Sequence, residues 1–341
     1  MKVLHVGAKN YPPAHGGTER VVYNIVNSID DVDFYILVEW QQQETDRIFV
    51  MPEGLGYLAK MKYIHQFAKQ HGIDIIHFHN EKYIPMAMLL AIRFKNIVLT
   101  VHGVHFRSPK WNMINRSIFW CVDVLGTVFL PRLVFCSEYD EKAFAKYIFF
   151  RKTYFINNGT NISPLKQTEQ SIEFSDTYIY LGRITPAKNV LRLVDAATSR
   201  KIKLHIYGVL DKECQEYCDE VMGKINASDY VEYKGVVPYD QVFQTMIKYK
   251  AFLYITIMEG LPLAVLEAAS CGMFLILSDI PHHTFLKVPN VKYVDVKDPQ
   301  IPYPEEIPSG ADNRAHILAH FSNKQMGDEY KKIYNSLKTM R

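Results

Sequence analysis

The chain has 341 residues, of which 48% are apolar and 22% charged, with a formal net charge of +3 at pH 7. This is the composition of a globular protein, and the length suits two domains of about 150 to 170 residues each. A charge so close to neutral argues against a nucleic acid as partner. The chain starts directly with an apolar run, without the basic start and apolar core of a secretory signal, so we expect a cytoplasmic protein.

The first half alternates apolar runs with helical stretches. The runs show little polar alternation, which is typical of strands covered on both faces. Strands are predicted at 3–6, 33–38, 74–79, 96–101, 132–137 and 152–157, and helices near 17–29, 57–71, 83–94, 112–128 and 138–147. Such alternation predicts a parallel sheet with helices on both faces.

The second half repeats this pattern after a polar stretch at 165–176. Strands are predicted at 177–182, 203–208, 230–235, 251–256, 273–278 and 291–296, and two helices between 311 and 340. We therefore predict an α/β protein of two doubly wound domains, 1–164 and 165–322. Ligands of open parallel sheets bind beyond the carboxyl ends of the strands, so two such sheets facing each other would define one cleft.

The five cysteines, an odd number, favour free thiols. They lack the paired CxxC spacing of zinc sites, and the odd number argues against a disulfide framework. Their positions are Cys121, Cys136, Cys214, Cys218 and Cys271.

Two strand–loop–helix motifs of the second half carry the chemically informative residues. In the motif EGLPLAVLEAASCG at 259–272, Glu259 precedes a helix and Glu267 lies inside it. A pair of this kind also occurs by chance, but the motif GRITPAKN at 182–189 adds Arg183 and Lys188, two cations that could grip a diphosphate. Helix N-terminal N–H groups beside these carboxylates would complete a pocket for a sugar and a phosphate.

The first half offers glycines and histidines. Gly16 and Gly17 precede a helix, which fits a phosphate loop or an ordinary glycine turn with Thr18 as N-cap. The GxGxxG pattern of dinucleotide enzymes is absent after Gly7, which weakens a dehydrogenase interpretation. His102 follows the strand at 96–101 where the chain enters the proposed cleft.

Three further histidines are weaker candidates. His105 would reach the cleft only through the geometry of its flanking residues. His77 and His79 share one strand face and have the spacing of metal ligands, but no third ligand is evident nearby. We expect these two to be structural or to line the cleft.

Five motifs together resemble the retaining glycosyltransferases of family 4, which have the GT-B fold of two Rossmann-like domains facing across a cleft. They occur in the family's order and span most of the chain: GGTE at 16–19, VHG at 101–103, NNGTN at 157–161, GRITPAKN at 182–189 and EGLPLAVLEAASCG at 259–272. The resemblance also implies that the last helix, 323–341, crosses back to the N-terminal domain.

The resemblance implies a role for each candidate residue. Gly16 and Gly17 would approach the donor phosphate through their backbone, and His102 would lie against the transferred sugar. Arg183 and Lys188 would hold the diphosphate, Glu259 the sugar hydroxyls and Glu267 the ribose. Backbone groups of Gly260, Leu261 and Leu263 would add donor contacts. The nucleobase would lie near 206–209 and 235–242, held by backbone groups near Val237.

The expected donor is a UDP- or GDP-linked sugar, with no cofactor and no metal. No Asp-x-Asp stands at a strand end to hold Mg²⁺, and the two cations could replace it at the departing diphosphate. Retention leaves two mechanisms open, a covalent sugar–enzyme intermediate or front-face attack. We favour the second, because no motif places a carboxylate as nucleophile.

The segment 106–135 is rich in aromatic and basic residues, among them Arg107, Lys110, Arg116 and Arg132. It fits a peripheral contact with an anionic membrane, or a core helix with a solvated basic edge. It is too short and too interrupted to span a bilayer.

Taken together, these features predict a hexosyltransferase acting on a glycan or lipid-linked glycan acceptor in bacterial surface-polysaccharide synthesis. An epimerase or phosphorylase of the same architecture, and a non-catalytic sugar-nucleotide-binding subunit, are the alternatives. A phosphorylase of the glycogen type would need a far longer chain.

Overall fold

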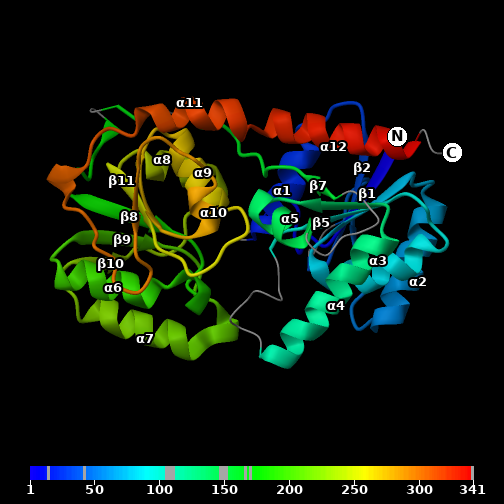
Figure 1. Cartoon of the computed structure of the whole chain (residues 1–341), viewed down its shortest axis with the longest axis horizontal. Coiled ribbons are helices and arrows are strands. Elements are labelled where there is room, and N and C mark those ends of the chain that lie inside the picture. Colours follow the sequence, from blue (N-terminus) through cyan, green and yellow to red (C-terminus); the bar gives the residue numbers. More distant parts are fainter. Residues whose placement is uncertain are drawn as a thin grey trace. The chain divides into compact units, whose positions relative to one another are not determined.

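The apolar runs form two separate parallel sheets, one in each half of the chain (Figure 1). The computed structural model describes residues 1–13, 16–40, 44–103, 112–145, 153–164, 167–168 and 171–338. The chain divides into an N-terminal unit, 1–159 with 323–341, and a C-terminal unit, 160–322. The division after Gly159 lies five residues before the boundary predicted from the sequence.

The N-terminal sheet has the strand order β3-β2-β1-β4-β5-β6-β7, with every neighbouring pair parallel. The strands are β1 (Lys2–Val6), β2 (Asp33–Val38), β3 (Ile48–Val50), β4 (Ile75–His79), β5 (Ile97–Val101), β6 (Arg132–Phe135) and β7 (Tyr154–Phe155). The short β3 is missing from the sequence prediction. The strand order reverses between β1 and β4, because β2 and β3 follow on one side of β1 and β4 to β7 lie on its other side. The loops after β1 and β4 therefore lie at a topological switch point.

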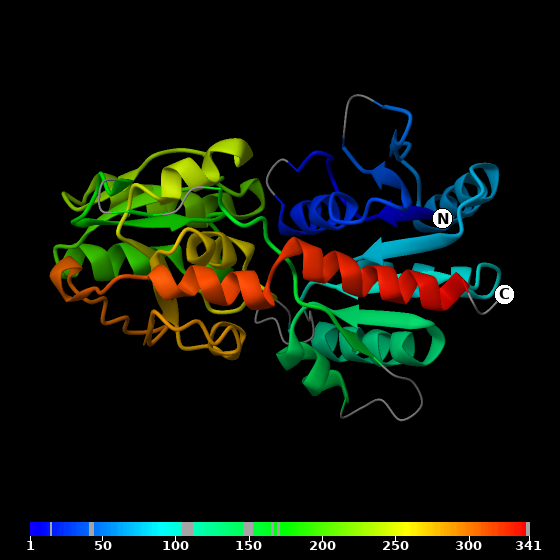
Figure 2. The same cartoon turned by 90° about the horizontal axis from the view of Figure 1, so that it is seen from above.

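Helices cover both faces of this sheet. They are α1 (Gly17–Val26), α2 (Tyr57–Gln70), the 3₁₀ turn η1 (Glu81–Tyr83), α3 (Ile84–Ala91), α4 (Met113–Phe129), α5 (Glu138–Ala145) and the C-terminal α12 (Asn323–Lys338). Figure 2 shows α12, in red, running alongside the N-terminal sheet beside α1. The last helix thus belongs to the first unit although 163 residues of the second unit, 160–322, separate it from β7 and the segment that ends at Gly159.

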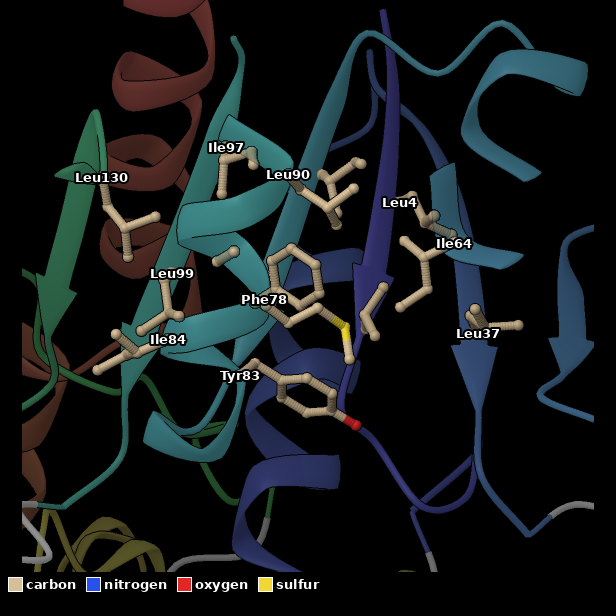
Figure 3. Close-up of a cluster of buried hydrophobic side chains, with 14 of the residues drawn as sticks. Leu4, Leu37, Ile64, Phe78, Tyr83, Ile84, Leu90, Ile97, Leu99 and Leu130 are labelled. Carbon is tan, nitrogen blue, oxygen red and sulfur yellow. The ribbon is translucent and has the colours of Figure 1, made fainter. Parts of the chain in front are cut away.

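Strand alternation divides the side chains of the N-terminal sheet between its two faces. Leu4, Phe78 and Leu99 pack with Ile64 of α2 and Leu90 of α3 in one apolar cluster (Figure 3). The intervening strand residues point to the opposite face, where the buried side chains include His5, His77, His79 and Thr100. A row of polar groups therefore lies beneath α12, on the face away from the apolar cluster.

The C-terminal sheet has the order β10-β9-β8-β11-β12-β13, again all parallel. Its strands are β8 (Thr177–Leu181), β9 (Lys203–Tyr207), β10 (Val231–Tyr233), β11 (Ala251–Tyr254), β12 (Phe274–Ser278) and β13 (Val291–Val294). Its α-helices are α6 (Val190–Ser199), α7 (Gln215–Asn226), α8 (Val242–Met246), α9 (Leu263–Ser270), α10 (Pro281–Thr284) and α11 (Ala311–His320). Two doubly wound parallel sheets are the fold class that the sequence predicts.

Among the helices of the described ranges, none combines the length and apolar character needed to cross a bilayer.

Candidate functional site

The loops after β8 and β11 meet at the topological switch point of the C-terminal sheet, where the strand order reverses. β8 and β11 are neighbours, and the chain builds outward to β10 on one side and to β13 on the other. Such a switch point leaves a crevice beyond the carboxyl ends of the strands, where ligands bind. The loops after β8 and β11 touch here, because the Ile257 N–H donates a hydrogen bond to the Ala187 carbonyl at 3.0 Å.

A buried ion pair joins the same two loops. Lys188 ends the 3₁₀ turn η4 (Pro186–Lys188) after β8, and its Nζ contacts Oε1 of Glu259 after β11. Their side chains are only 18% and 9% exposed. Burial alone would raise the pKa of Glu259, but the charge and hydrogen bond of Lys188, with smaller contributions from His283 and Tyr254, together lower it. The structure therefore holds an ionised carboxylate against an ammonium group at the switch point.

Two tyrosine rings lie beside this pair. Tyr180 of β8 and Tyr254 of β11 stack with ring centroids 5.5 Å apart, and Lys188 Nζ lies 5.4 Å from the centroid of Tyr254. The Tyr180 hydroxyl donates to the Arg183 carbonyl at 3.1 Å. The rings thus fix both the ammonium group and the backbone of the loop after β8.

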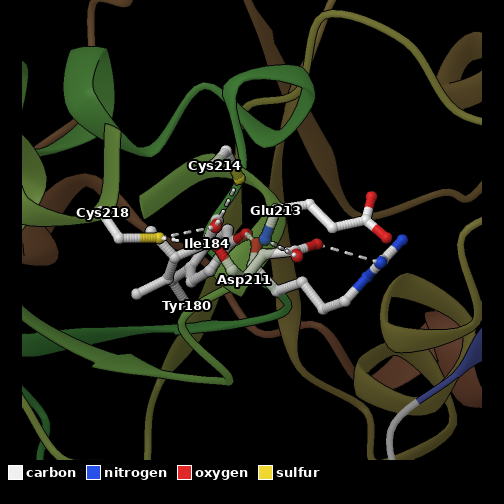
Figure 4. A network of polar contacts seen from close by, with 7 residues as sticks. Tyr180, Ile184, Asp211, Glu213, Cys214 and Cys218 are labelled. Carbon is white, nitrogen blue, oxygen red and sulfur yellow. Dashed lines mark hydrogen bonds and ion pairs between the residues drawn. The ribbon is translucent and has the colours of Figure 1, made fainter. Parts of the chain in front are cut away.

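Arg183 is an exposed cation at this edge of the sheet. Its side chain is 56% exposed, and its Nη1 lies 3.2 Å from Oδ2 of Asp211, which follows β9. Asp211 also accepts a hydrogen bond from the Glu213 N–H, and the Cys218 thiol donates to the carbonyl of Ile184 (Figure 4). The loop is held by its backbone while its guanidinium group stays open to solvent.

A close backbone approach brings the loops after β8 and β9 together. Gly208 has φ +151°, and a Cβ at this position would lie 1.8 Å from the carbonyl oxygen of Gly182. Any side chain at Gly208 would therefore displace the loop that carries Arg183.

The predicted donor contacts of the second motif surround the start of α9. Gly260 and Leu261 lie in the loop after Glu259, and Leu263 is the first residue of α9, so its N–H lacks a partner within the helix. Glu267 lies inside α9 and is 4% exposed.

Val237 lies in the segment after β10, at the same carboxyl edge of the sheet. That segment is tied to β9 because the Gly208 N–H donates to the Gly235 carbonyl at 2.9 Å. The C-terminal sheet thus places the predicted contacts of Arg183, Lys188, Val237 and Glu259 along one edge.

In the N-terminal unit, the glycine motif forms the start of α1. Gly16 is the N-cap and Gly17 the first helical residue, so the prediction of Thr18 as N-cap is wrong. The Gly16 N–H donates to the Glu19 carboxylate at 3.3 Å, which takes over the capping role. A Cβ at Gly17 would meet no atom within 4 Å, so the space beside its backbone is open.

His102 follows β5 and is hydrogen-bonded within a group of histidines. Its Nε2 lies 3.1 Å from Nδ1 of His79, and Nε2 of His79 lies 2.8 Å from Nδ1 of His5. Burial lowers the pKa of His102 to about 4 and that of His5 to about 3, so both rings are neutral at pH 7. His105 lies outside the described residues.

The expectation that His77 and His79 lack a third neighbour of their kind is wrong. Ring nitrogens of His5, His77 and His79 lie within 4.8 Å of one another. His77 is hydrogen-bonded at Nδ1 to the Tyr334 hydroxyl and at Nε2 to Thr100 Oγ1, at 2.8 Å each. These bonds give His77 a structural role beneath α12.

Sequence reasoning missed several residues of these surroundings. Asp211 could have been found, because it follows a predicted strand at the same sheet edge as Arg183. For Tyr180 and Tyr254 the sequence pattern predicts only a place in a strand, not a role in the site. No sequence pattern indicates a role for His5, because it contacts His79 only through the pairing of β1 with β4.

The sequence pattern described as Glycosyltransferase Family 4 matches residues 15–163, and that of Glycosyl transferases group 1 matches residues 164–288. The chain belongs to glycosyltransferase family 4. It is a glycosyltransferase, which sets the epimerase and binding-subunit alternatives aside.

Relatives in this family include the GDP-mannose:cellobiosyl-diphosphopolyprenol alpha-mannosyltransferase of Xanthomonas campestris. The two sequences are 25% identical over 312 residues, which cover 82% of this chain and 79% of the relative. The lipopolysaccharide 1,6-galactosyltransferase of Escherichia coli K12 is 27% identical over 52% of this chain and 60% of its own length.

Solved structures agree on the GT-B fold. Sucrose-phosphate synthase of Thermosynechococcus elongatus superposes with a TM-score of 0.82 at 14% identity, covering all of both chains. HepE of Anabaena, solved in complex with UDP and glucose, gives a TM-score of 0.78 at 17% identity over 98% of this chain and all of its own. At these identities, the likeness shows the fold alone.

Proposed function

We propose that this glycosyltransferase transfers a hexose from a UDP- or GDP-linked donor to a lipid-linked glycan, with retention and without a metal ion. The observation that carries the proposal is the junction of Lys188 and Glu259 at the switch point of the C-terminal sheet. One loop supplies cations for a diphosphate and the other supplies carboxylates for hydroxyl groups. A nucleotide sugar needs both.

The donor is proposed to be bound by residues of the carboxyl edge. Lys188 and Arg183 take the diphosphate, Glu259 the sugar hydroxyls and Glu267 the ribose, while the segment around Val237 takes the base. Arg183 suits the phosphates because its exposed guanidinium group offers a planar fork of donors. The Xanthomonas relative is named for GDP-mannose and HepE was solved with UDP, so both nucleotides are candidates.

The acceptor is proposed to be a glycan on a diphosphopolyprenol carrier in surface-polysaccharide synthesis. This inference comes from the name of the Xanthomonas relative, whose acceptor is cellobiosyl-diphosphopolyprenol. The family resemblance assigns His102 to the transferred sugar.

We infer front-face attack as the mechanism of retention. The bond between the sugar's anomeric carbon and the phosphate oxygen breaks, and the bond to the acceptor oxygen forms on the same face. The acceptor proton passes to an oxygen of the leaving phosphate. Lys188 and Arg183 offset the charge that develops on the diphosphate, which is electrostatic catalysis by positioned cations.

Two carboxylate variants test the site. Glu267→Ala should weaken the affinity for UDP or GDP in calorimetric titration, because it removes the ribose contact. Glu259→Ala should mainly lower kcat with UDP-glucose or GDP-mannose, because it removes the contact to the sugar hydroxyls. Glu216→Ala, on the exposed side of α7, is the matched control and should change neither. Negligible effects of both site variants would remove the assignment.

A metal chelator and product analysis test the remaining parts. EDTA should leave the rate of transfer unchanged if the two cations suffice. NMR of the first-formed product should show the anomeric configuration of the donor. Inversion, or a rate that returns only with added Mg²⁺, would refute the mechanism.

We also propose that α4 attaches the enzyme to anionic membranes. Its exposed apolar side chains recur at helical spacing on one side: Met113, Ile114, Ile118, Leu125, Val128 and Phe129. Arg116 lies on the same helix, whereas Arg107 and Lys110 lie outside the described residues. An apolar stripe with basic neighbours is the pattern of interfacial helices.

Vesicle sedimentation tests the attachment. The protein should bind vesicles with phosphatidylglycerol at low salt and release at high salt, and Ile114→Glu with Ile118→Glu should abolish binding. The exposed Leu318→Glu of α11 is the control, and it should still bind. Equal binding by all variants, or none by the wild type, would overturn this proposal.

A further inference from the structure

Three histidine rings form a hydrogen-bonded row across the central strands of the N-terminal sheet. His5 lies on β1, His79 ends β4 and His102 follows β5, and β1, β4 and β5 are neighbours in that order. The planes of His5 and His79, and those of His79 and His102, are inclined by only 20°. Neighbouring rings are joined edge to edge through ring nitrogens at 2.8 and 3.1 Å.

A neutral imidazole carries one N–H donor and one acceptor nitrogen. His79 is bonded through both of its nitrogens, so it accepts from one neighbour and donates to the other. The two hydrogen bonds must therefore run in the same direction along the row. Either each ring donates toward His102, or each donates toward His5.

The far end of the row decides between the two directions. Nε2 of His5 is buried and has no hydrogen-bond partner among the described residues. If the row ran toward His5, this atom would be a buried N–H without an acceptor, which proteins rarely tolerate. If each ring donates toward His102, Nε2 of His5 is an unprotonated nitrogen whose lone pair has no donor. A buried acceptor without a donor costs less free energy than a buried N–H without an acceptor.

We propose that His79, backed by His5, is a positioning residue that holds His102 as the tautomer protonated at Nδ1. In this arrangement Nε2 of His102 accepts from Nδ1–H of His79. No described residue bonds to Nδ1 of His102, so its N–H is available as a donor. Resting on the proposed function, this N–H would meet an oxygen of the transferred sugar. The role of His102 thereby depends on two residues that touch neither donor nor acceptor.

A metal centre is the rival use of these rings. Of the six ring nitrogens of His5, His77 and His79, five are already hydrogen-bonded, and Nε2 of His5 has no partner in the part of the chain that the structure describes. A bound cation would need at least two of these bonds to break, and it would remove the row. The contacts of His5, His77 and His79 therefore fit a hydrogen-bonded network better than a metal site.

Nitrogen-15 NMR of the wild-type protein tests the tautomer without any substrate. Long-range proton–nitrogen spectra should show His102 protonated at Nδ1 and bare at Nε2. Protonation at Nε2, or displacement of these signals by one equivalent of Zn²⁺ bound to His5 and His79, would overturn the proposal. Because no sugar is involved, this outcome is independent of the proposed transferase chemistry.

A pair of variants tests the positioning role. His79→Gln can accept from His5 and donate to His102, whereas His79→Leu can do neither. With UDP-glucose or GDP-mannose, kcat for release of nucleoside diphosphate should fall at least about tenfold in His79→Leu, be largely restored in His79→Gln, and leave KM for the donor unchanged.

Calorimetric binding of UDP and GDP should be equal in all three proteins, which also shows that the variants fold. Equal kcat values in His79→Leu and wild type would contradict the positioning role. A wild type that releases no nucleoside diphosphate from either donor would contradict the proposed function instead.

Discussion

The ion pair between Lys188 and Glu259 shows how much a single buried contact constrains the C-terminal unit. Both side chains are largely buried, so each charge depends on the other for compensation. Removing one partner of such a pair leaves an uncompensated buried charge, which costs about 3 to 5 kcal/mol. The same dependence makes the pair responsive to a bound diphosphate, because a second anion would compete for Lys188.

A double-mutant cycle should show this dependence. Lys188→Met should lower the free energy of unfolding by about 3 kcal/mol, because it leaves the Glu259 carboxylate unpaired. The double variant Lys188→Met/Glu259→Gln should recover part of this loss, with a coupling of about 1 to 3 kcal/mol. Circular dichroism during urea unfolding measures the wild type, the two single variants Lys188→Met and Glu259→Gln, and the double variant. Strictly additive effects would mean that the two side chains are not coupled.

Helix α4 carries a buried acid on the side opposite its exposed apolar side chains. Asp123 is 2% exposed, and its Oδ2 has no hydrogen-bond partner among the described residues. Burial, with a smaller contribution from the negative charge of Glu81, raises the pKa of Asp123 to about 9. The carboxyl group is therefore protonated at neutral pH.

This pKa predicts how the stability of the N-terminal unit depends on pH. Between the ordinary pKa of 3.8 and about 9, the folded state keeps a proton that the unfolded state has lost, so stability falls as pH rises. Asp123→Asn is always neutral and should remove this slope. Relative to that of the wild type, the free energy of unfolding of the variant should rise by about 4 to 5 kcal/mol between pH 5 and pH 8.5, or about 1.4 kcal/mol per pH unit, in urea unfolding. A constant difference across this range would contradict the pKa.

The elements also show what can be predicted from the sequence. The strands with long apolar runs, such as Asp33–Val38, were identifiable because both faces of each sheet are covered. The three-residue β3 was not, because a run so short has no periodicity. The cap of α1 differs from the prediction, because the Glu19 carboxylate and not the Thr18 hydroxyl bonds the backbone at the start of the helix.

Some residues of the candidate site could be predicted from the sequence, and others could not. Motifs indicated Lys188 and Glu259, and the switch-point rule explains why their loops meet. The histidine row could not be predicted, because His5 and His79 are 74 positions apart and meet only through strand order. Sequence spacing carries no record of which strands become neighbours.

The N-terminal unit is assembled from two segments that are far apart in the sequence, 1–159 and 323–341. Tyr330 and Tyr334 of α12 are fully buried, and their hydroxyls are hydrogen-bonded to Thr100 and His77 at 2.9 and 2.8 Å. Residues on two central strands thus depend on a helix made after the entire second unit. The N-terminal unit can therefore reach its final stability only once α12 has been made and packed on it.

A conservative variant should expose this dependence. Tyr334→Phe keeps the ring but leaves Nδ1 of His77 buried without its partner, which should cost about 1 to 3 kcal/mol. Trp40 and Trp120 belong to the N-terminal unit, and the sequence 160–322 of the other unit contains no tryptophan, so tryptophan fluorescence during urea unfolding reports on the N-terminal unit.

Tyr303→Phe is the matched control, because this tyrosine is 39% exposed and lies in the other unit. It should leave the fluorescence midpoint unchanged. If Tyr334→Phe also leaves the midpoint unchanged, its hydroxyl does not hold α12 to the sheet, and apolar packing alone must do so. Removal of 323–341 would then lower the midpoint only by the loss of that packing.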